Sequence, residues 1–325
     1  MALYQAPVIL GILSPSIIAM SINSFHYVKV NGIQLCFLRW GDPKSKKPPA
    51  LLVHGTGFVA ATWRPIAEAL MKEYVVFAID RRGHGRSTVP KKGYEFLDFA
   101  EDLAGFIEAL GIQGAYGIGH SAGATDILLA AGLLPHGFAR VFAMEPTVQD
   151  PTIEWPTEIE LSEKQRAVIE SRRRRCEEFA SRDEVFERYS SRPPLNIWRS
   201  EILQEYVAHG FKEVGSERVR LRCSPDIEAT MIESIYRAMA NCYHGDWRGD
   251  PFSLLLRIHC PVTVSSSAHS PAIYRKMAEI AARVIPHARL FRFDRAGHYV
   301  PQANPEMLLD AIRKFAQVTL MRTPV

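Results

Sequence analysis

The sequence predicts an α/β fold, a mostly parallel, doubly wound sheet with one inserted helical segment. Short apolar runs alternate with helix-period segments along most of the chain, which is typical of parallel strands joined by helices. This alternation stops after Glu145 and resumes near residue 259. With 325 residues, 47% of them apolar, the chain is long enough for one large domain with a sizeable insertion.

The first half contains the clearest alternation. Asn31-Gly32 separates two strand-like runs and is a strong two-residue hairpin signal. Uniformly apolar runs such as 50–53 indicate strands that are buried on both faces of a sheet. The predicted strands are 26–30, 33–40, 50–53, 74–79, 115–118 and 139–144, and the predicted helices are 63–71, 96–110 and 122–133.

Residues 146–255 contain helical patterns and no buried strand, and Arg, Glu, Tyr and Trp are frequent there. The sheet pattern then returns with strands at 259–264 and 289–293 and helices at 272–285 and 306–321. We therefore expect a core made of residues 23–145 and 256–325, a helical insertion over 146–255, and an apolar N-terminal arm over 1–22.

The N-terminal arm has an apolar run, residues 8–20, which is too short to span a bilayer and is interrupted by Gly11 and Pro15. No Lys or Arg precedes it, so the charged region of a signal peptide is missing. We expect the arm to pack on the body or on a partner subunit, which leaves a homodimer open. Weak contact with a membrane surface is the alternative, and no firm membrane association is expected.

The bulk composition excludes several classes of protein. The net charge of +4 is too small to indicate nucleic-acid binding. Five cysteines without paired spacing are typical of reduced thiols in the cytoplasm. The sequence has no C-x-x-C motif or His/Cys cluster, so we expect no metal site.

The most informative motif is G-x-S-x-G, formed by Gly119, Ser121 and Gly123 between a predicted strand and a predicted helix. This order of strand, motif and helix defines a nucleophile elbow, a sharp turn that exposes the serine hydroxyl. Side chains two positions before and after the serine would collide with the adjoining strand and helix. Both positions are glycine, so we expect Ser121 to be a nucleophile.

Three further motifs follow the ends of predicted strands, where open α/β sheets place their sites. His54-Gly55-Thr56-Gly57 follows the strand at 50–53, D-x-x-G-x-G-x-S occupies 80–87, and Gly297-His298 follows the strand ending at residue 293.

As an ordered set, the four motifs resemble those of the α/β-hydrolase superfamily, in particular its serine esterases and lipases. The resemblance covers residues 25–145 and 255–320. It implies that Ser121 is the nucleophile, that His298 is the general base, and that the insertion is a cap over the site. Asp80 and His84 of the second motif are expected to tie their loop together through hydrogen bonds.

The acid of the expected catalytic triad departs from the usual pattern. The family commonly places an Asp shortly after the strand found here at 259–264, but no Asp or Glu occurs between Asp250 and Glu279. Some members supply the acid from the end of the preceding core strand, where this chain has Glu145. We therefore expect Glu145 to be the acid. Asp294 is the fallback, and the alternative role of Glu145 is to cap the first helix of the insertion.

The resemblance also implies an oxyanion hole made of two backbone amides. One is the amide of Ala122, and the other comes from Thr56, with Gly57 as a neighbouring candidate. The residues expected to line the substrate pocket are His54, Gly55, Phe58, Trp63, His120 and Tyr299.

The insertion carries a basic run, residues 172–175, that is either an anion site or a solvated helix face. Because glutamates are interspersed along the same segment, we prefer the solvated face. The aromatic residues expected to form the core of the insertion, with one or two facing the cleft, are Trp155, Trp198, Tyr206 and Tyr236.

These features predict a cofactor-independent cytoplasmic serine hydrolase that cleaves a small-molecule carboxylic ester through an acyl-enzyme. Hydrolysis of lactones or C–C bonds and peracid formation use the same groups and remain alternatives. A non-catalytic ligand-binding protein is a further alternative. Epoxide hydrolases and haloalkane dehalogenases need Asp where this chain has Ser121, so we do not expect those activities.

Overall fold

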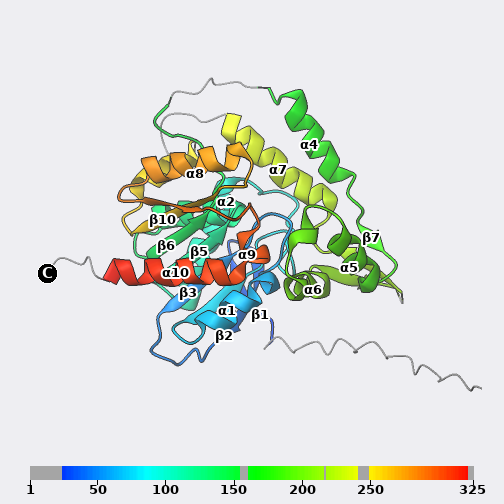
Figure 1. Ribbon diagram of the computed structural model, residues 1–325, viewed down its shortest axis with the longest axis horizontal. Helices are drawn as coiled ribbons and strands as arrows, with labels where there is room; N and C mark the ends of the chain where they lie inside the picture. The colour runs from blue at the N-terminus through cyan, green and yellow to red at the C-terminus, as the bar shows by residue number, and fades with distance from the viewer. Residues whose placement is uncertain (1–23, 154–159, 216, 241–248, 321–325) are drawn as a thin grey trace, which may run out of the picture.

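The computed structural model describes residues 24–153, 160–215, 217–240 and 249–320, and its centre is an eight-stranded sheet (Figure 1). The strand order is β1-β2-β4-β3-β5-β6-β10-β11. The six strands from β4 to β11 run parallel, and the β1–β2 hairpin adds the antiparallel edge. The predicted fold class is confirmed. The strands are β1 (His26–Val30), β2 (Ile33–Trp40), β3 (Pro49–Val53), β4 (Val75–Ile79), β5 (Ala115–His120), β6 (Phe138–Met144), β10 (Val262–Ser267) and β11 (Arg289–Phe293).

Helices cover both faces of this sheet. Successive residues of a strand point to opposite faces, so Leu51 and Val53 join one core cluster and Leu52 joins the other. The first cluster also contains side chains of α2 (Phe96–Leu110), α3 (Ala122–Leu133) and α8 (Ala272–Val284). The second contains side chains of α1 (Arg64–Leu70) and α10 (Pro305–Leu320). The uniformly apolar strands are therefore buried on both sides, as their sequence predicts.

Local signals set the ends of several elements. Helix α2 begins with a capping box between Glu95 and Asp98 and ends at Gly111, which adopts the left-handed conformation at φ 63°. Asn31 and Gly32 both have positive φ, as a type I′ hairpin turn requires. The 3-10 helix η1 (Ala60–Trp63) precedes α1, and the short α9 (Val300–Ala303) precedes α10.

The segment between β6 and β10 contains helices together with a small antiparallel sheet in the order β7-β9-β8. The expectation of helices alone was therefore wrong. These strands have only two to four residues, too few for an alternating pattern to stand out in the sequence. The elements are α4 (Glu163–Arg173), β7 (Glu178–Phe179), α5 (Arg182–Ser191), η2 (Leu195–Ile197), α6 (Ser200–His209), β8 (Phe211–Val214), β9 (Arg218–Leu221), α7 (Pro225–Ala240) and η3 (Pro251–Arg257).

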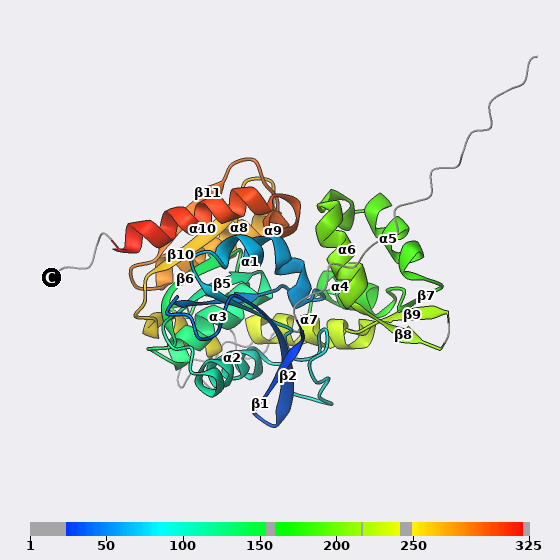
Figure 2. The ribbon, with the colours of Figure 1, turned by 90° about the horizontal axis from the view of Figure 1, so that it is seen from below.

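Figure 2 shows α4, α5, α6 and the small sheet gathered beside one end of the main sheet. Side chains of α6 join the same apolar cluster as α1 and α10, so this part of the insertion shares a core with the body. The Tyr206 hydroxyl donates a hydrogen bond to the carbonyl oxygen of Gly57 at 2.9 Å. The insertion is thus attached directly to the loop that follows β3.

Two predictions, the apolar arm at 1–22 and the place of Trp155, lie outside the described residues. In the part of the chain that the structure describes, no helix combines the length and apolar character needed to cross a bilayer. The cysteines described there, Cys36, Cys176, Cys223 and Cys260, are all unpaired.

The contact between α3 and η3 yields a stability prediction. A methyl group on Gly132 would lie 2.3 Å from the carbonyl oxygen of Leu254, so Gly132→Ala must push η3 away. We expect a loss of about 1–3 kcal/mol in the free energy of unfolding, measured by urea denaturation. The control is Gly105→Ala in α2, where the added carbon would lie 3.3 Å from Val30 Cβ and where alanine favours the helix by up to about 1 kcal/mol. Equal stability of the two variants would contradict this packing.

Candidate active site

Ser121 lies at a sharp turn between β5 and α3, with φ 55° and ψ −125°. A Cβ on Gly119 would lie 2.6 Å from backbone atoms of α3. A Cβ on Gly123 would lie 2.5 Å from the carbonyl oxygens of Val53 and His54 at the end of β3. Neither contact leaves room for a side chain, so the two glycines are what allow the turn to form. The predicted strand–turn–helix context of Ser121 is confirmed.

Glu145, after β6, and His298, after β11, come together at the carboxyl ends of the parallel strands, with 2.5 Å between Glu145 Oε2 and His298 Nδ1. Glu145 directly follows β6, is almost fully buried and has a φ of 45°. Its carboxylate accepts hydrogen bonds from the Ser267 amide at 2.7 Å and from the Ser270 hydroxyl at 2.9 Å. The serine-rich segment after β10, which lacks the usual Asp, therefore holds the carboxylate that comes from β6.

The two alternatives for the acid do not fit this geometry. The Asp294 side chain is 86% exposed and lies near Arg292 on the surface. Helix α4, the first described helix of the insertion, is capped by Ser162, so Glu145 is not its cap. The structure thus brings Glu145, and not Asp294, to His298.

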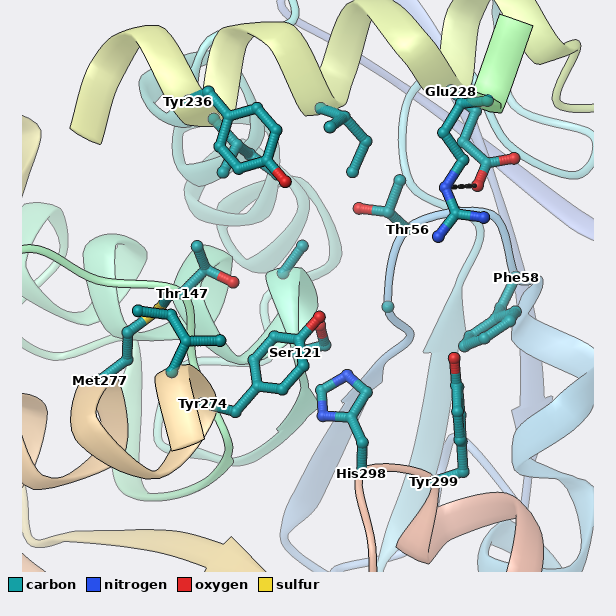
Figure 3. Close-up of a pocket in the computed structure, with 16 residues that line it drawn as sticks. Thr56, Phe58, Ser121, Thr147, Glu228, Tyr236, Tyr274, Met277, His298 and Tyr299 are labelled. Carbon is teal, nitrogen blue, oxygen red and sulfur yellow. Dashed lines mark ion pairs between the residues drawn. The ribbon is translucent and has the colours of Figure 1, made fainter. Parts of the chain in front are cut away.

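Two contacts, besides the hydrogen bond to Glu145, fix the position of His298. The Tyr274 ring stacks on the imidazole with 4.1 Å between ring centroids. His120 Nε2 donates a hydrogen bond to the carbonyl oxygen of His298 at 2.8 Å. Figure 3 shows the His298 ring and Ser121 beside each other in the middle of one cavity, which both residues line.

Two backbone amides beside Ser121 are free to bind an oxyanion. Ala122 is the first residue of α3, so its N–H has no partner within the helix. The N–H of Thr56 has no acceptor among the described residues, whereas the N–H of Gly57 is donated to His84 Nε2 at 2.9 Å. Gly57 is thereby excluded as a donor. Thr56 and Ala122 both line the cavity.

Two buried histidines hold the loop that carries Thr56. His54 Nδ1 donates to the Gly55 carbonyl and its Nε2 accepts from the Arg81 amide. His84 Nδ1 donates to the Arg82 carbonyl and its Nε2 accepts from Gly57. Burial, followed by the nearby Arg81 charge, lowers the pKa of His54 to about 3. Burial likewise places the pKa of His84 well below its usual value.

The second motif is structural, as its sequence suggests. The Asp80 carboxylate accepts hydrogen bonds from the amides of Ala60 and Arg86, and His84 ties the loop at 80–87 to the loop after β3. Among the described residues, no three His, Cys, Asp or Glu side chains gather as a metal site requires.

The cavity has a volume of about 220 Å³ and two unlike ends. Figure 3 shows Tyr236, Thr147 and Met277 at one end and Glu228, Phe58 and Tyr299 at the other, with Ser121 between them. Sequence reasoning placed Gly55, Phe58 and Tyr299 at this cavity, and the structure does so too. It missed the lining residues from α7 and α8. These are Glu228, Ile232, Ile235, Ile273, Tyr274 and Met277.

Three residues predicted to line the pocket do not line it. Trp63 is 1% exposed and packs in the core beside α1. His54 is fully buried because both of its ring nitrogens bind backbone groups of the loops. His120 is 1% exposed because its ring turns toward the His298 backbone. These three predictions were wrong.

The basic run of the insertion is largely solvated, as predicted, because Arg172, Arg173 and Arg174 are exposed. Arg172 lines the cavity, and Arg175 binds Glu228, Tyr189 and the Tyr206 hydroxyl. Only Arg175, which is half-buried, departs from the predicted solvated face. Of the predicted aromatic residues, Trp198 and Tyr206 are buried and Tyr236 faces the cavity.

The neutral histidines predict a loss of stability in acid. In the unfolded chain His54 and His84 take up a proton near pH 6.5, whereas in the fold they stay neutral to a much lower pH. The unfolded state then binds more protons, so the free energy of unfolding falls as the pH drops below about 6.5, by up to about 1.4 kcal/mol per pH unit for each histidine. Asp126, whose pKa burial raises to about 6, offsets a smaller part below that pH.

Urea denaturation at about pH 7 and about pH 5 measures this effect. We expect a lower free energy of unfolding at the acidic pH. Unchanged or greater stability there would show that the two histidines are not held neutral.

Known proteins resemble this chain, some over most of its length and others over about a third of it. A 2-(acetamidomethylene)succinate hydrolase of Mesorhizobium japonicum is 26% identical over 280 residues, which cover 84% of this chain and 89% of the relative. A bifunctional esterase/perhydrolase of Acinetobacter calcoaceticus is 34% identical over 107 residues, 33% of this chain and 38% of the relative.

A crystal structure of E-2-(acetamidomethylene)succinate hydrolase superposes with a TM-score of 0.72 at 24% identity, covering 90% of this chain and 99% of that chain, and supports the fold. The model of the alpha/beta hydrolase family matches residues 50–311. The chain therefore belongs to the alpha/beta hydrolase family.

Proposed function

We propose that this hydrolase cleaves carboxylic esters through a Ser121–His298–Glu145 triad and an acyl-enzyme. The observation that carries the proposal is the largely buried hydrogen bond of 2.5 Å between Glu145 and His298, beside a half-buried serine on a sharp turn. Two free amides in the same cavity supply the remaining part that acyl transfer needs.

In the proposed reaction, His298 Nε2 takes the proton of the Ser121 hydroxyl as its oxygen attacks the ester carbonyl. Glu145 holds the proton on Nδ1 and stabilises the imidazolium ion that forms. The amides of Thr56 and Ala122 donate to the oxyanion of the tetrahedral intermediate. His298 then protonates the departing alcohol, and a water molecule cleaves the acyl-enzyme by the same steps to release the acid.

A second candidate is cleavage of a lactone or of a C–C or amide-type bond by the same residues. It is supported by the relative that matches over 89% of its own length, which is named a 2-(acetamidomethylene)succinate hydrolase rather than an esterase. Only the leaving group differs between these reactions, so the triad does not discriminate between them. A non-catalytic binding protein is disfavoured, because binding alone needs neither the strained serine nor the buried carboxylate.

Covalent labelling tests the nucleophile. A fluorophosphonate should add its phosphonyl group to Ser121, detected as a mass shift on the peptide that carries this residue. Ser121→Ala should remove both the label and the hydrolysis of a short activated ester, while the circular dichroism spectrum stays that of the wild type. Undiminished turnover by Ser121→Ala would exclude Ser121 from the mechanism.

The acid is tested by a matched pair of neutralising substitutions. Glu145→Gln leaves His298 without its carboxylate, so we expect kcat to fall about 10³- to 10⁴-fold. Asp294→Asn removes a carboxylate that is 86% exposed and should change kcat less than about twofold. The opposite ranking of the two variants would reject Glu145 as the acid.

A further inference from the structure

A second cavity of about 370 Å³ adjoins the one that contains Ser121. The two share lining residues at the polar end of the first cavity, including Thr56, Arg172 and Glu228. We call the second cavity the arginine chamber, because five arginines line it. They are Arg172, Arg174, Arg175, Arg188 and Arg192.

The charges of the arginine chamber are not balanced by its own lining. Among the described residues, Glu228 is the one carboxylate that faces the five guanidinium groups. It pairs with Arg175 at 2.7 Å and with Arg172 at 3.6 Å. Within the described ranges, Arg174, Arg188 and Arg192 form no ion pair with a carboxylate. Gathering like charges is unfavourable unless an anion joins them.

The arginines come from two parts of the chain, residues 172–175 and residues 188–192; Arg172, Arg174 and Arg192 are exposed, and Arg175 and Arg188 are half-buried. Arg172 lies in the last turn of α4, Arg188 lies in α5, and Arg192 follows α5. Arg175 is fixed by hydrogen bonds to the hydroxyls of Tyr189 and Tyr206. The fold itself therefore brings these guanidinium groups to one cavity.

The chamber is connected to the site of the proposed reaction. The same Tyr206 hydroxyl that accepts from Arg175 donates to the carbonyl oxygen of Gly57, next to Thr56. In Figure 3, Glu228 marks the side of the cavity that leads to the chamber, and Met277 marks the opposite, apolar side. A substrate placed across Ser121 would thus have one end in each environment.

We propose that the arginine chamber binds an anionic group of the substrate, a phosphate or a carboxylate, on one side of the scissile bond, while the apolar end of the first cavity binds the other side. This inference rests on the proposed ester hydrolysis. Guanidinium groups bind phosphate and carboxylate oxygens through paired N–H donors, so both a phosphate monoester and a dicarboxylate have the required chemistry.

Binding is measured on the full chain by isothermal titration calorimetry with inorganic phosphate and with succinate. The test variant is Arg188→Gln/Arg192→Gln. The control is Arg166→Gln/Arg173→Gln on α4, which removes the same charge from two arginines that do not line the chamber. We expect the test variant to weaken anion binding at least about tenfold and the control to keep it.

The anion that binds more tightly identifies the kind of anionic group that the substrate carries. Tighter binding of phosphate indicates a phosphate ester, and tighter binding of succinate indicates a dicarboxylate. Failure of both anions to bind the wild type, or equal weakening in the control variant, would overturn the proposed anion site.

A kinetic comparison separates this inference from the proposed function. The substrates are 4-nitrophenyl butyrate, which is neutral, and mono-4-nitrophenyl adipate, which ends in a carboxylate. We expect the test variant to lower kcat/KM about tenfold for the adipate and to leave the butyrate unchanged. Equal kcat/KM values for the test and control variants on both esters would overturn the proposed anion site in the arginine chamber. They would leave the proposed ester hydrolysis standing. Anion binding by a wild type that cleaves neither ester would overturn the ester hydrolysis instead.

Discussion

The hydrogen bond between the Glu145 carboxylate and the His298 imidazole is the constraint on which the rest of the site depends. A buried carboxylate is costly unless other groups bind it, and here neighbouring strands supply them. The Glu145 amide donates to the Ser265 carbonyl, while Ser267 and Ser270 donate to the carboxylate. The parallel pairing of β6 with β10 therefore determines the position of the Glu145 carboxylate. His298, on the loop after β11, takes its orientation from that point.

The insertion contributes to the site through contacts as well as through cover. Tyr206 of α6 binds the backbone beside Thr56, and Arg175 binds Tyr206. The loop after β3 is held in place by hydrogen bonds of His54 and His84 from the core and by the hydrogen bond of Tyr206 from the insertion. One chain of hydrogen bonds, from Arg175 through Tyr206 to Gly57, thus joins the lining of the arginine chamber to the loop that carries Thr56.

Local rules predicted the sheet, and the motifs together with the family resemblance pointed to Ser121, His298 and Glu145, which the structure brings to one site. Apolar runs mark strands that are buried on both faces. Glycine is the only residue type that fits at positions 119 and 123, because a Cβ there would collide with backbone atoms. The empty position after β10 pointed to Glu145. The pocket was harder, because the face that α7 and α8 turn to the cavity depends on tertiary packing. His54, which lies next to a motif, points away from the cavity because its ring nitrogens bind backbone groups. The arginines come together only through the tertiary packing of α4 and α5.

Proton NMR of the folded protein tests the central hydrogen bond most directly. A proton held between His298 Nδ1 and the buried Glu145 carboxylate is deshielded and protected from exchange with water. We expect a single proton resonance far downfield of the amide region, which couples to an imidazole nitrogen and is lost in His298→Ala. A downfield region without such a resonance, at low temperature and neutral pH, would contradict the hydrogen bond between Glu145 and His298.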